Sequence, residues 1–257
     1  PVIIGVFMMR NAPRKVAERL PAILEQAKAC FGTPSFRMLL ATYFLQVSFL
    51  TIVTSNLLFV LKYQFQLEDP VSANARFFVI FVVATMASMA FWSWVGSKIG
   101  KKRGYIYSTI GLALSVSLVF LLDADNVAWL YPLMGLIGWF FGGYQLFPWS
   151  MIPDSVSEGQ ARTGMSLEGA YNGWFTTYQK IGIAFGQLVF GALLSLSGYE
   201  PAFYEAGVRV FPEQSDGAIL MIRICSSLLP GAMFLLSLLF LMRHQNSSTG
   251  PAAKATS

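Results

Sequence analysis

The sequence predicts an all-α membrane protein whose chain crosses the bilayer six times. Three observations carry this prediction. Only 12% of the 257 residues are charged, against about 25% in a soluble domain. Hydrophobic residues make up 55% of the chain, and the mean hydropathy is +0.56. The apolar residues stand in long blocks, and a block of about 20 residues crosses the hydrocarbon as a helix. The sequence does not show the alternating pattern of a membrane β-barrel.

Four regions follow from this reading. Residues 1–9 resemble the end of an earlier helix, and residues 10–37 form a polar loop that contains an amphipathic helix. We expect that helix to lie along the membrane surface, although an ordinary loop helix without lipid contact explains the pattern nearly as well. Residues 38–242 form the six-helix bundle, and residues 243–257 form a disordered tail. The predicted spans are 38–62, 76–97, 104–122, 128–152, 169–197 and 218–242.

The charges of the links between spans predict the orientation. Basic residues gather before the first span, in the link 98–103 and after the last span, whereas the alternate links are acidic. Basic loops stay in the cytoplasm, so we expect loops 10–37, 98–103 and 153–168 and the tail to be cytoplasmic, in a plasma or inner membrane. The net charge of +5 follows this topology and does not form one soluble basic face, which argues against binding to nucleic acid.

Other chemistry is scarce in the sequence. Cys30 and Cys225 do not predict a disulfide framework. The single histidine, His244, lies in the tail, and no catalytic or metal-ligand pair stands at matched depth. We therefore predict neither an enzyme nor a resident cofactor or metal. The chain opens with Pro1 and shows no signal-peptide pattern, so we expect a fragment or a processed chain.

Lys180 stands near the middle of the span 169–197. Counting from Tyr171, a rise of 1.5 Å per residue puts it about 14 Å deep, close to the centre of a hydrocarbon core about 30 Å thick. A lysine there costs about 2.5–3.5 kcal/mol unless a partner or a wet cavity receives it. Small and polar residues share its helical face: Asn172, Gly173, Thr176, Thr177, Ala184, Gln187 and Gly191. The pattern predicts a solute pathway. A lysine that snorkels or pins helix packing is the structural alternative.

Two other spans carry candidate solute contacts. Thr51 and Asn56 belong to a polar stripe in the first span. Tyr144 and Gln145 lie in "GWFFGGYQLFPWSMIPD", where the glycine pair and Pro148 would allow the helix to bend. Bent helices at membrane depth are places where transporters bind solutes. Each of these polar side chains could instead hold helices together.

The cytoplasmic links carry a family resemblance. They read "GSKIGKKRG" (96–104) and "DSVSEGQARTGMSLEGAY" (154–171). The Asp, Arg-Thr-Gly and Glu-Gly-Ala-Tyr elements of the second link resemble the glycoside–pentoside–hexuronide:cation symporters, the melibiose-permease-like branch of the major facilitator superfamily. The family's eleventh helix carries a lysine with a threonine one turn earlier, as Lys180 and Thr176 stand here. This sequence departs from the family at two places. Ser157 stands where the family usually has a second acid, and Met165-Ser166-Leu167 replaces a run that is typically basic in the family.

The resemblance covers most of residues 1–242 and implies the C-terminal half of a twelve-helix transporter. Residues 1–9 would end helix six, and the six spans would be helices seven to twelve. The implied function is secondary symport by alternating access, coupled to Na⁺ or H⁺, with the cation-binding acids on the absent N-terminal half. The solute would be small and polar, most readily a sugar or glycoside. A lysophospholipid or another amphipath is the alternative solute, and a non-transporting scaffold or a self-assembling half-transporter is the alternative of another class.

The resemblance also suggests roles for single residues. Lys180 would couple solute binding to cation occupancy, and the candidate solute contacts are Thr176, Gln145, Asn56, Thr51 and Tyr144. A cytoplasmic gate would stabilise closed arrangements through ion pairs and would use Asp154, Arg162, Glu168, Lys101, Lys102 and Arg103. The partners expected are the solute, membrane lipid and the N-terminal half.

Overall fold

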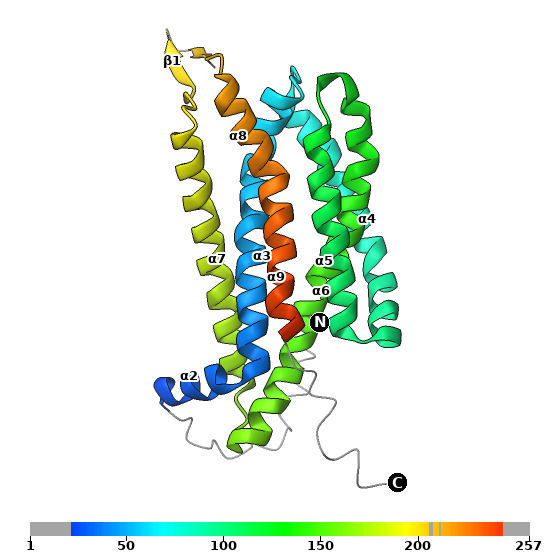
Figure 1. The fold of residues 1–257 in the computed structure, drawn as a ribbon, viewed down its shortest axis with the longest axis vertical. Coiled ribbons are helices and arrows are strands. Elements are labelled where there is room, and N and C mark those ends of the chain that lie inside the picture. The colour runs from blue at the N-terminus through cyan, green and yellow to red at the C-terminus, as the bar shows by residue number, and fades with distance from the viewer. Residues whose placement is uncertain (1–21, 206–207, 211, 244–257) are drawn as a thin grey trace, which may run out of the picture.

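The computed structural model describes residues 22–205, 208–210 and 212–243, which form a bundle of long helices (Figure 1). The predictions for residues 1–9, for the first part of the loop 10–37 and for the tail beyond Arg243 lie outside these ranges. The α-helices are α2 (Ile23–Gly32), α3 (Pro34–Phe59), α4 (Pro70–Ile99), α5 (Lys101–Leu118), α6 (Leu130–Thr163), α7 (Glu168–Leu196), α8 (Asp216–Ser226) and α9 (Leu228–Arg243).

Within the part of the chain that the structure describes, six helical segments are long and apolar enough to cross a membrane, with α8 and α9 counted as one. This confirms the predicted all-α, six-span class. A π-helix (Val60–Gln64) ends α3, and 3₁₀ turns (Val119–Leu121 and Ala124–Trp129) lie between α5 and α6. Two short antiparallel strands, β1 (Phe203–Glu205) and β2 (Val208–Val210), lie in the link before α8. The sequence did not predict this hairpin.

The helices pack in a row, α7 on α3, α3 on α9, α9 on α5, α5 on α6 and α6 on α4. The apolar part of α3 is 50% buried, whereas the corresponding parts of α4 and α7 are only 11% and 22% buried. The two helices at the ends of the row therefore present most of the free surface, to lipid or to another bundle.

A close helix contact joins α4 to α6 at Gly138. A Cβ atom built on Gly138 would stand 2.4 Å from the carbonyl oxygen of Phe81, so only glycine permits this approach of the two backbones. Side chains cross the same contact. The Thr85 hydroxyl donates to the Gly138 carbonyl over 3.1 Å, and the Trp92 indole N–H donates to the Trp139 carbonyl over 2.7 Å. Hydrogen bonds thus reinforce a packing that glycine allows.

A buried polar network joins α3, α5 and α9. The Tyr105 hydroxyl donates to Oε1 of Gln46. Nε2 of Gln46 donates to the hydroxyl oxygen of Ser237 over 2.8 Å and reaches that of Thr109 over 3.5 Å. Inside hydrocarbon, polar groups must find partners within the protein. Gln46 therefore fixes the register of three helices.

Two of the predicted spans that contain prolines differ from the structure. The last span is two helices, because Pro230 has no N–H and its ring crowds the carbonyl four residues earlier. Ser227 accordingly leaves helical geometry, with φ −138° and ψ −75°. In α6, by contrast, Pro148 and Pro153 lie inside one continuous helix. This helix runs to Thr163, although we predicted that the span would end at residue 152.

The basic and acidic links lie at opposite ends of the bundle (Figure 1). The helix α2, the α4–α5 turn and the α6–α7 link lie at one end, and the α3–α4 link, the α5–α6 link and β1 lie at the other. At the second end Asp69 caps α4, because its carboxylate accepts a bond from the Ser72 backbone N–H over 3.1 Å. The Ser72 hydroxyl group, and after it the Ser72 backbone N–H, lowers the pKa of the Asp69 carboxyl group. The side of the membrane that each end faces stays a prediction.

Candidate functional site

Lys180 lies on the side of α7 that is turned away from α3. The packing side of α7 contains Gly182 and Gly186, and a Cβ atom on Gly186 would stand 2.2 Å from the Ser48 carbonyl oxygen. Lys180 is exposed, and no other described residue forms a hydrogen bond or an ion pair with it. An ammonium group in the middle of a spanning helix thus faces outward from the described bundle.

The predicted polar stripe forms one surface, which we call the Lys180 face: residues 172, 173, 176, 177, 180, 184, 187 and 191. Most of these residues are exposed, and Thr176 is half-buried. The Thr176 hydroxyl bonds to the carbonyls of Asn172 and Gly173, both over 3.0 Å. Gly173 and Gly191 lie in open space, since a Cβ atom on either would meet no atom within 4 Å. Leu188, an apolar residue beside this face, is also exposed, at 71%.

The other predicted solute contacts do not join this face. Asn56 is fully buried, and its amide nitrogen donates to the Ile222 carbonyl of α8 over 2.6 Å. The Thr51 hydroxyl donates to the Val47 carbonyl of its own helix over 2.8 Å. The arrangement therefore fits helix packing at these positions. As solute contacts Asn56 and Thr51 stay predictions.

Tyr144 and Gln145 also lie apart from the Lys180 face. Tyr144 is fully buried on α6 beside Tyr43, Phe141 and Phe234, and its hydroxyl has no partner among the described residues. Gln145 is half-buried. The structure thus places Lys180 and Thr176 on one face and the remaining four candidates at other positions in the bundle. As solute contacts Tyr144 and Gln145 also stay predictions.

An aromatic cluster on three helices was missed by sequence reasoning. The rings of Tyr43 and Phe175 stack with centroids 4.5 Å apart, and Trp149 meets Phe175 edge-on at 4.9 Å. The Gln179 amide, one residue before Lys180, donates to the Tyr43 hydroxyl over 3.0 Å. This cluster fixes the turn of α7 that carries the lysine. Its only sequence signal was the presence of aromatic residues at similar positions in three spans.

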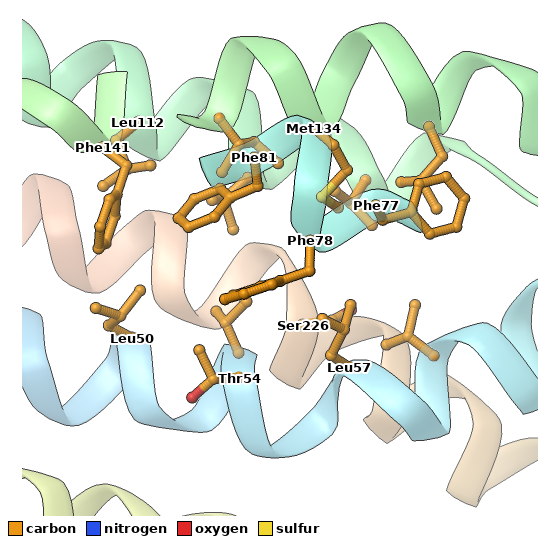
Figure 2. Close-up of a pocket in the computed structure, with 16 residues that line it drawn as sticks. Leu50, Thr54, Leu57, Phe77, Phe78, Phe81, Leu112, Met134, Phe141 and Ser226 are labelled. Carbon is orange, nitrogen blue, oxygen red and sulfur yellow. The ribbon is translucent and has the colours of Figure 1, made fainter. Parts of the chain in front are cut away.

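A second feature without a sequence signal is an apolar pocket between α3, α4, α5 and α6, closed on one side by the end of α8 (Figure 2), with a volume of about 180 Å³. Sixteen residues line it, among them Leu50, Leu57, Phe78, Phe81, Met134 and Phe141. Thr54 and Ser226 are the only lining residues with a side-chain oxygen. Each side-chain hydroxyl donates to a carbonyl of its own helix, over 3.1 and 2.9 Å.

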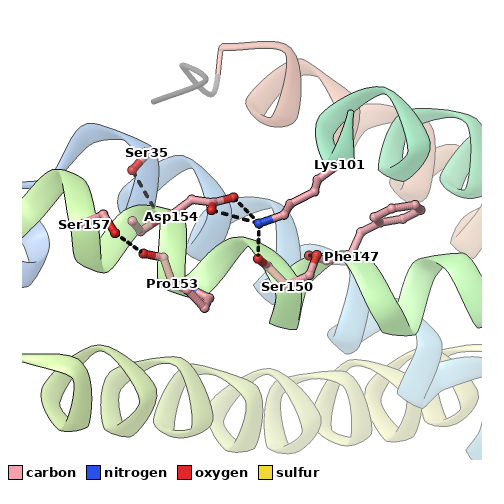
Figure 3. A network of polar contacts seen from close by, with 8 residues as sticks. Ser35, Lys101, Phe147, Ser150, Pro153, Asp154 and Ser157 are labelled. Carbon is pink, nitrogen blue, oxygen red and sulfur yellow. Dashed lines mark hydrogen bonds and ion pairs between the residues drawn. The ribbon is translucent and has the colours of Figure 1, made fainter. Parts of the chain in front are cut away.

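The residues predicted for a cytoplasmic gate lie at the basic end of the bundle, and Figure 3 shows two of them, Lys101 and Asp154. The Lys101 ammonium forms an ion pair of 2.8 Å with Asp154 and also donates to the Ser150 carbonyl over 2.9 Å. These two charged side chains are 43% and 41% exposed. The Lys102 ammonium donates to the Met242 carbonyl over 2.8 Å. α5 is thereby tied to α6 and α9 at this end.

Arg162 joins α6 to α2, because its guanidinium donates to the Gly32 carbonyl over 2.7 Å. Arg103 and Glu168 are exposed, and Glu168 lies in the first turn of α7. The hydroxyl groups of Thr33 and Tyr171 share a bond of 2.7 Å that ties the end of α2 to α7. That these residues form a gate stays a prediction.

The helix α2 is bound firmly to this end of the bundle. The Phe31 ring meets those of Trp174 and Tyr178 on α7 with centroids 5.1 and 5.8 Å away. Cys30 is buried, and burial raises the pKa of its thiol to about 11. Ile23 and Leu24 are exposed, at 79% and 67%. The amphipathic helix predicted here exists in part, and its contact with lipid stays a prediction.

Six spanning helices, basic links at one end and an unpartnered mid-helix lysine define a bundle of the kind that builds one half of a secondary transporter. The comparison with known families agrees. A family model described as MFS/sugar transport protein matches residues 2–246, and the chain belongs to this family. This confirms the resemblance to the major facilitator symporters. The protein is therefore a multi-pass membrane protein of a transporter family, which is not a class of enzymes.

Three curated relatives are similar to the chain. An uncharacterized symporter of Synechocystis is 28% identical over 91% of this chain and 42% of its own length. The sodium-dependent lysophosphatidylcholine symporter 1-A of Danio rerio is 25% identical over 82% of this chain and 38% of its own length. The sphingosine-1-phosphate transporter MFSD2B of Mus musculus is 27% identical over 64% and 31%. The chain thus spans less than half the length of the curated relatives that it matches.

Proposed function

We propose that the chain is the C-terminal half of a cation-coupled symporter that works by alternating access, with the Lys180 face turned toward the N-terminal half. Exposure of Lys180 in the middle of a spanning helix is the observation that carries this proposal. An ammonium group at that depth requires an anionic partner or water. The open space at Gly173 and Gly191 supports the proposal, because small residues let another helix approach closely.

The proposed coupling is electrostatic. Carboxylates of the N-terminal half would bind either the Lys180 ammonium or the coupling cation, since each positive charge stabilises the same anions. When the cation binds, the ammonium is released and can bind an anionic or polar group of the solute. Solute and cation then stabilise the same arrangement of the two halves, which is the thermodynamic requirement for symport.

The ion pair between Lys101 and Asp154 would act as part of the cytoplasmic gate. Both side chains are more than two-fifths exposed, so the pair contributes only about 0.2–1 kcal/mol. A contact of this strength can be broken in each transport cycle. Arg162, Lys102, Arg103 and Glu168 would contribute to the same gate.

Replacement of Lys180 by glutamine tests the proposal. In the full-length protein, reconstituted in vesicles, Lys180→Gln is expected to abolish accumulation of solute driven by a cation gradient. Lys28→Gln on α2 removes the same charge outside the spans and is expected to leave uptake unchanged. Undiminished cation-driven uptake in Lys180→Gln would remove Lys180 from the mechanism. Parallel measurements with sodium and proton gradients identify the cation, and we propose sodium because one relative is named as sodium-dependent.

Two classes of solute have support. The family description favours a sugar or glycoside, whereas two relatives are named as carriers of lysophosphatidylcholine and sphingosine-1-phosphate. A competition assay distinguishes these classes: it compares how far sugars and how far lysophosphatidylcholine inhibit uptake of the solute. A self-assembling half-transporter is tested by cross-linking in detergent, because a functional homodimer of this chain would need no separate N-terminal half.

A further inference from the structure

The Tyr43 hydroxyl group of α3 is bonded to Gln179, the residue that precedes Lys180 on α7. We propose that Tyr43 and Gln179 are positioning residues for symport, which fix the rotation of α7 about its axis and thereby keep the Lys180 ammonium group turned toward the N-terminal half. Neither residue contacts solute or cation in this role. The inference rests on the proposed function and adds the contact that determines how well the lysine competes with the coupling cation.

The orientation of Lys180 follows from that of its neighbour. Residues at spacings of three and four share one side of a helix, and on the side of α7 that packs on α3 these are Phe175, Gln179, Gly182 and Gly186. Consecutive residues are turned by about 100° about the helix axis. Because Gln179 is directed at α3, Lys180 is directed away from it and is exposed.

The glycine contacts fix how closely α7 approaches α3, but they give little resistance to rotation. A Cβ atom on Gly186 would stand 2.2 Å from the Ser48 carbonyl oxygen, and one on Gly182 would stand 2.5 Å from Cγ1 of Val47. No side chain projects from α7 at these two positions, so the helix surface is smooth there. The spanning part of α7 is only 22% buried, and the other described helices therefore add little restraint.

The bond between Gln179 and Tyr43 supplies the restraint that the glycines lack. It has a length of 3.0 Å, and Tyr43 is 1% exposed. Rotation of α7 would break this bond and leave polar groups without partners in an apolar environment, which is unfavourable. In the described part of the chain, the other side-chain hydrogen bond from α7 to a neighbouring element joins Tyr171 to Thr33, about 14 Å along the helix from Lys180. The bond at Gln179 is therefore the polar restraint next to the lysine.

The ring and the hydroxyl group of Tyr43 can be tested separately. The ring stacks on that of Phe175 with centroids 4.5 Å apart. Tyr43→Phe keeps this stacking and removes only the hydroxyl group that Gln179 binds. Tyr178 offers a matched control at the same interface. Its ring meets that of Phe44 on α3 with centroids 6.4 Å apart, and its hydroxyl group has no hydrogen-bond partner among the described residues.

The sign of the expected effect follows from the proposed competition. The Lys180 ammonium group and the coupling cation stabilise the same carboxylates, so a lysine that is held less firmly competes less well, and the cation binds more tightly. An interhelical hydrogen bond in a membrane protein changes an equilibrium by about threefold. Loss of the bond should therefore tighten cation binding by up to about threefold, whereas general damage to the fold would weaken it.

The test titrates sodium, and in parallel protons, into the full-length protein in nanodiscs and measures the dissociation constant of the cation. Tyr43→Phe and Gln179→Leu should each lower this constant by up to about threefold. The double variant should lower it no further, because both substitutions remove the same bond. Tyr178→Phe should leave it at the wild-type value. Lys180→Gln removes the competitor and should lower it at least as far, and adding Tyr43→Phe to Lys180→Gln should change nothing more.

Two results would overturn the inference. One is a dissociation constant in Tyr43→Phe that equals or exceeds the wild-type value while Lys180→Gln lowers it. The other is a further decrease when Tyr43→Phe is added to Lys180→Gln, because Tyr43 would then act by a route other than the lysine. Failure of the proposed function looks different. If Lys180→Gln leaves the dissociation constant unchanged, the lysine does not compete with the cation, and the proposed coupling is rejected together with the inference.

Discussion

The contact between α4 and α6 permits a stability prediction with a control in the same helix. Gly138 and Gly135 stand less than one turn apart on α6. A Cβ atom on Gly138 would be 2.4 Å from the Phe81 carbonyl oxygen, whereas one on Gly135 would meet its nearest atom, Cγ2 of Ile80, at 3.8 Å. We therefore expect Gly138→Ala to destabilise the protein and Gly135→Ala to be neutral or mildly stabilising.

The magnitude follows from the geometry. The obstacle at Gly138 is backbone and cannot rotate away, so α4 must move by about 1 Å to restore the 3.4 Å of an ordinary contact. Overpacking of this kind costs about 1–3 kcal/mol. The same displacement stretches the hydrogen bonds from Thr85 and Trp92 to α6, each of which contributes about 0.6 kcal/mol in a membrane protein. At Gly135 the methyl group meets no obstacle, and alanine gains up to about 1 kcal/mol of helix propensity.

Thermal unfolding in nanodiscs, followed by tryptophan fluorescence, measures the difference between the two variants. The predicted result is a lower unfolding temperature for Gly138→Ala than for Gly135→Ala. If both variants unfold at the wild-type temperature, the backbones of α4 and α6 do not approach at Gly138 as described. If both are equally destabilised, the cause is a general intolerance of α6 to alanine and not this contact.

Three further predictions concern other parts of the bundle. Gln46→Leu removes the partner of the Tyr105 and Ser237 hydroxyl groups and should lower the free energy of unfolding by about 1–3 kcal/mol. The control Gln160→Leu, at an exposed position, should lower it little. Equal losses in the two variants would contradict the buried network around Gln46. A double-mutant cycle on Lys101 and Asp154 should give a coupling of about 0.2–1 kcal/mol that falls with salt, and a larger, salt-independent value would contradict the exposure of the pair. Because the pKa of the Cys30 thiol is raised from 9.0 to about 11, its alkylation near neutral pH should be about 100-fold slower than in the unfolded chain. The raised pKa also stabilises the fold below pH 9, and this contribution is lost as the pH rises toward about 11; alkylation at the unfolded rate would show that the thiol is not buried.

The spans could be predicted because composition and loop charge are local properties of the sequence. Blocks of apolar residues gave the number of spans, and alternating charge separated the links into two groups that the structure places at opposite ends. Boundaries were less accurate where proline is involved. Pro148 and Pro153 did not end α6, whereas Pro230 did divide the last span, because the effect of a proline depends on whether neighbouring helices support the interrupted turn.

The candidate site was predictable only where one helical face carried the signal. The Lys180 face follows from spacing along a single helix, and the structure keeps it together. Positions on different helices could not be placed from the sequence, since the rotation of each helix about its axis depends on its neighbours. Asn56 therefore turned out to bond to α8, and the apolar pocket, whose lining comes from five helices, left no trace in the sequence.

The way α2 is attached has a mechanical consequence. Phe31 wedges it against α7, Arg162 ties it to α6, and Thr33 leads directly into α3. Because α2 is attached at three points, it cannot rotate independently and must move together with the whole bundle. A fluorophore on the exposed Lys28 would consequently track the tilt of this half during turnover, without touching either the Lys180 face or the pocket.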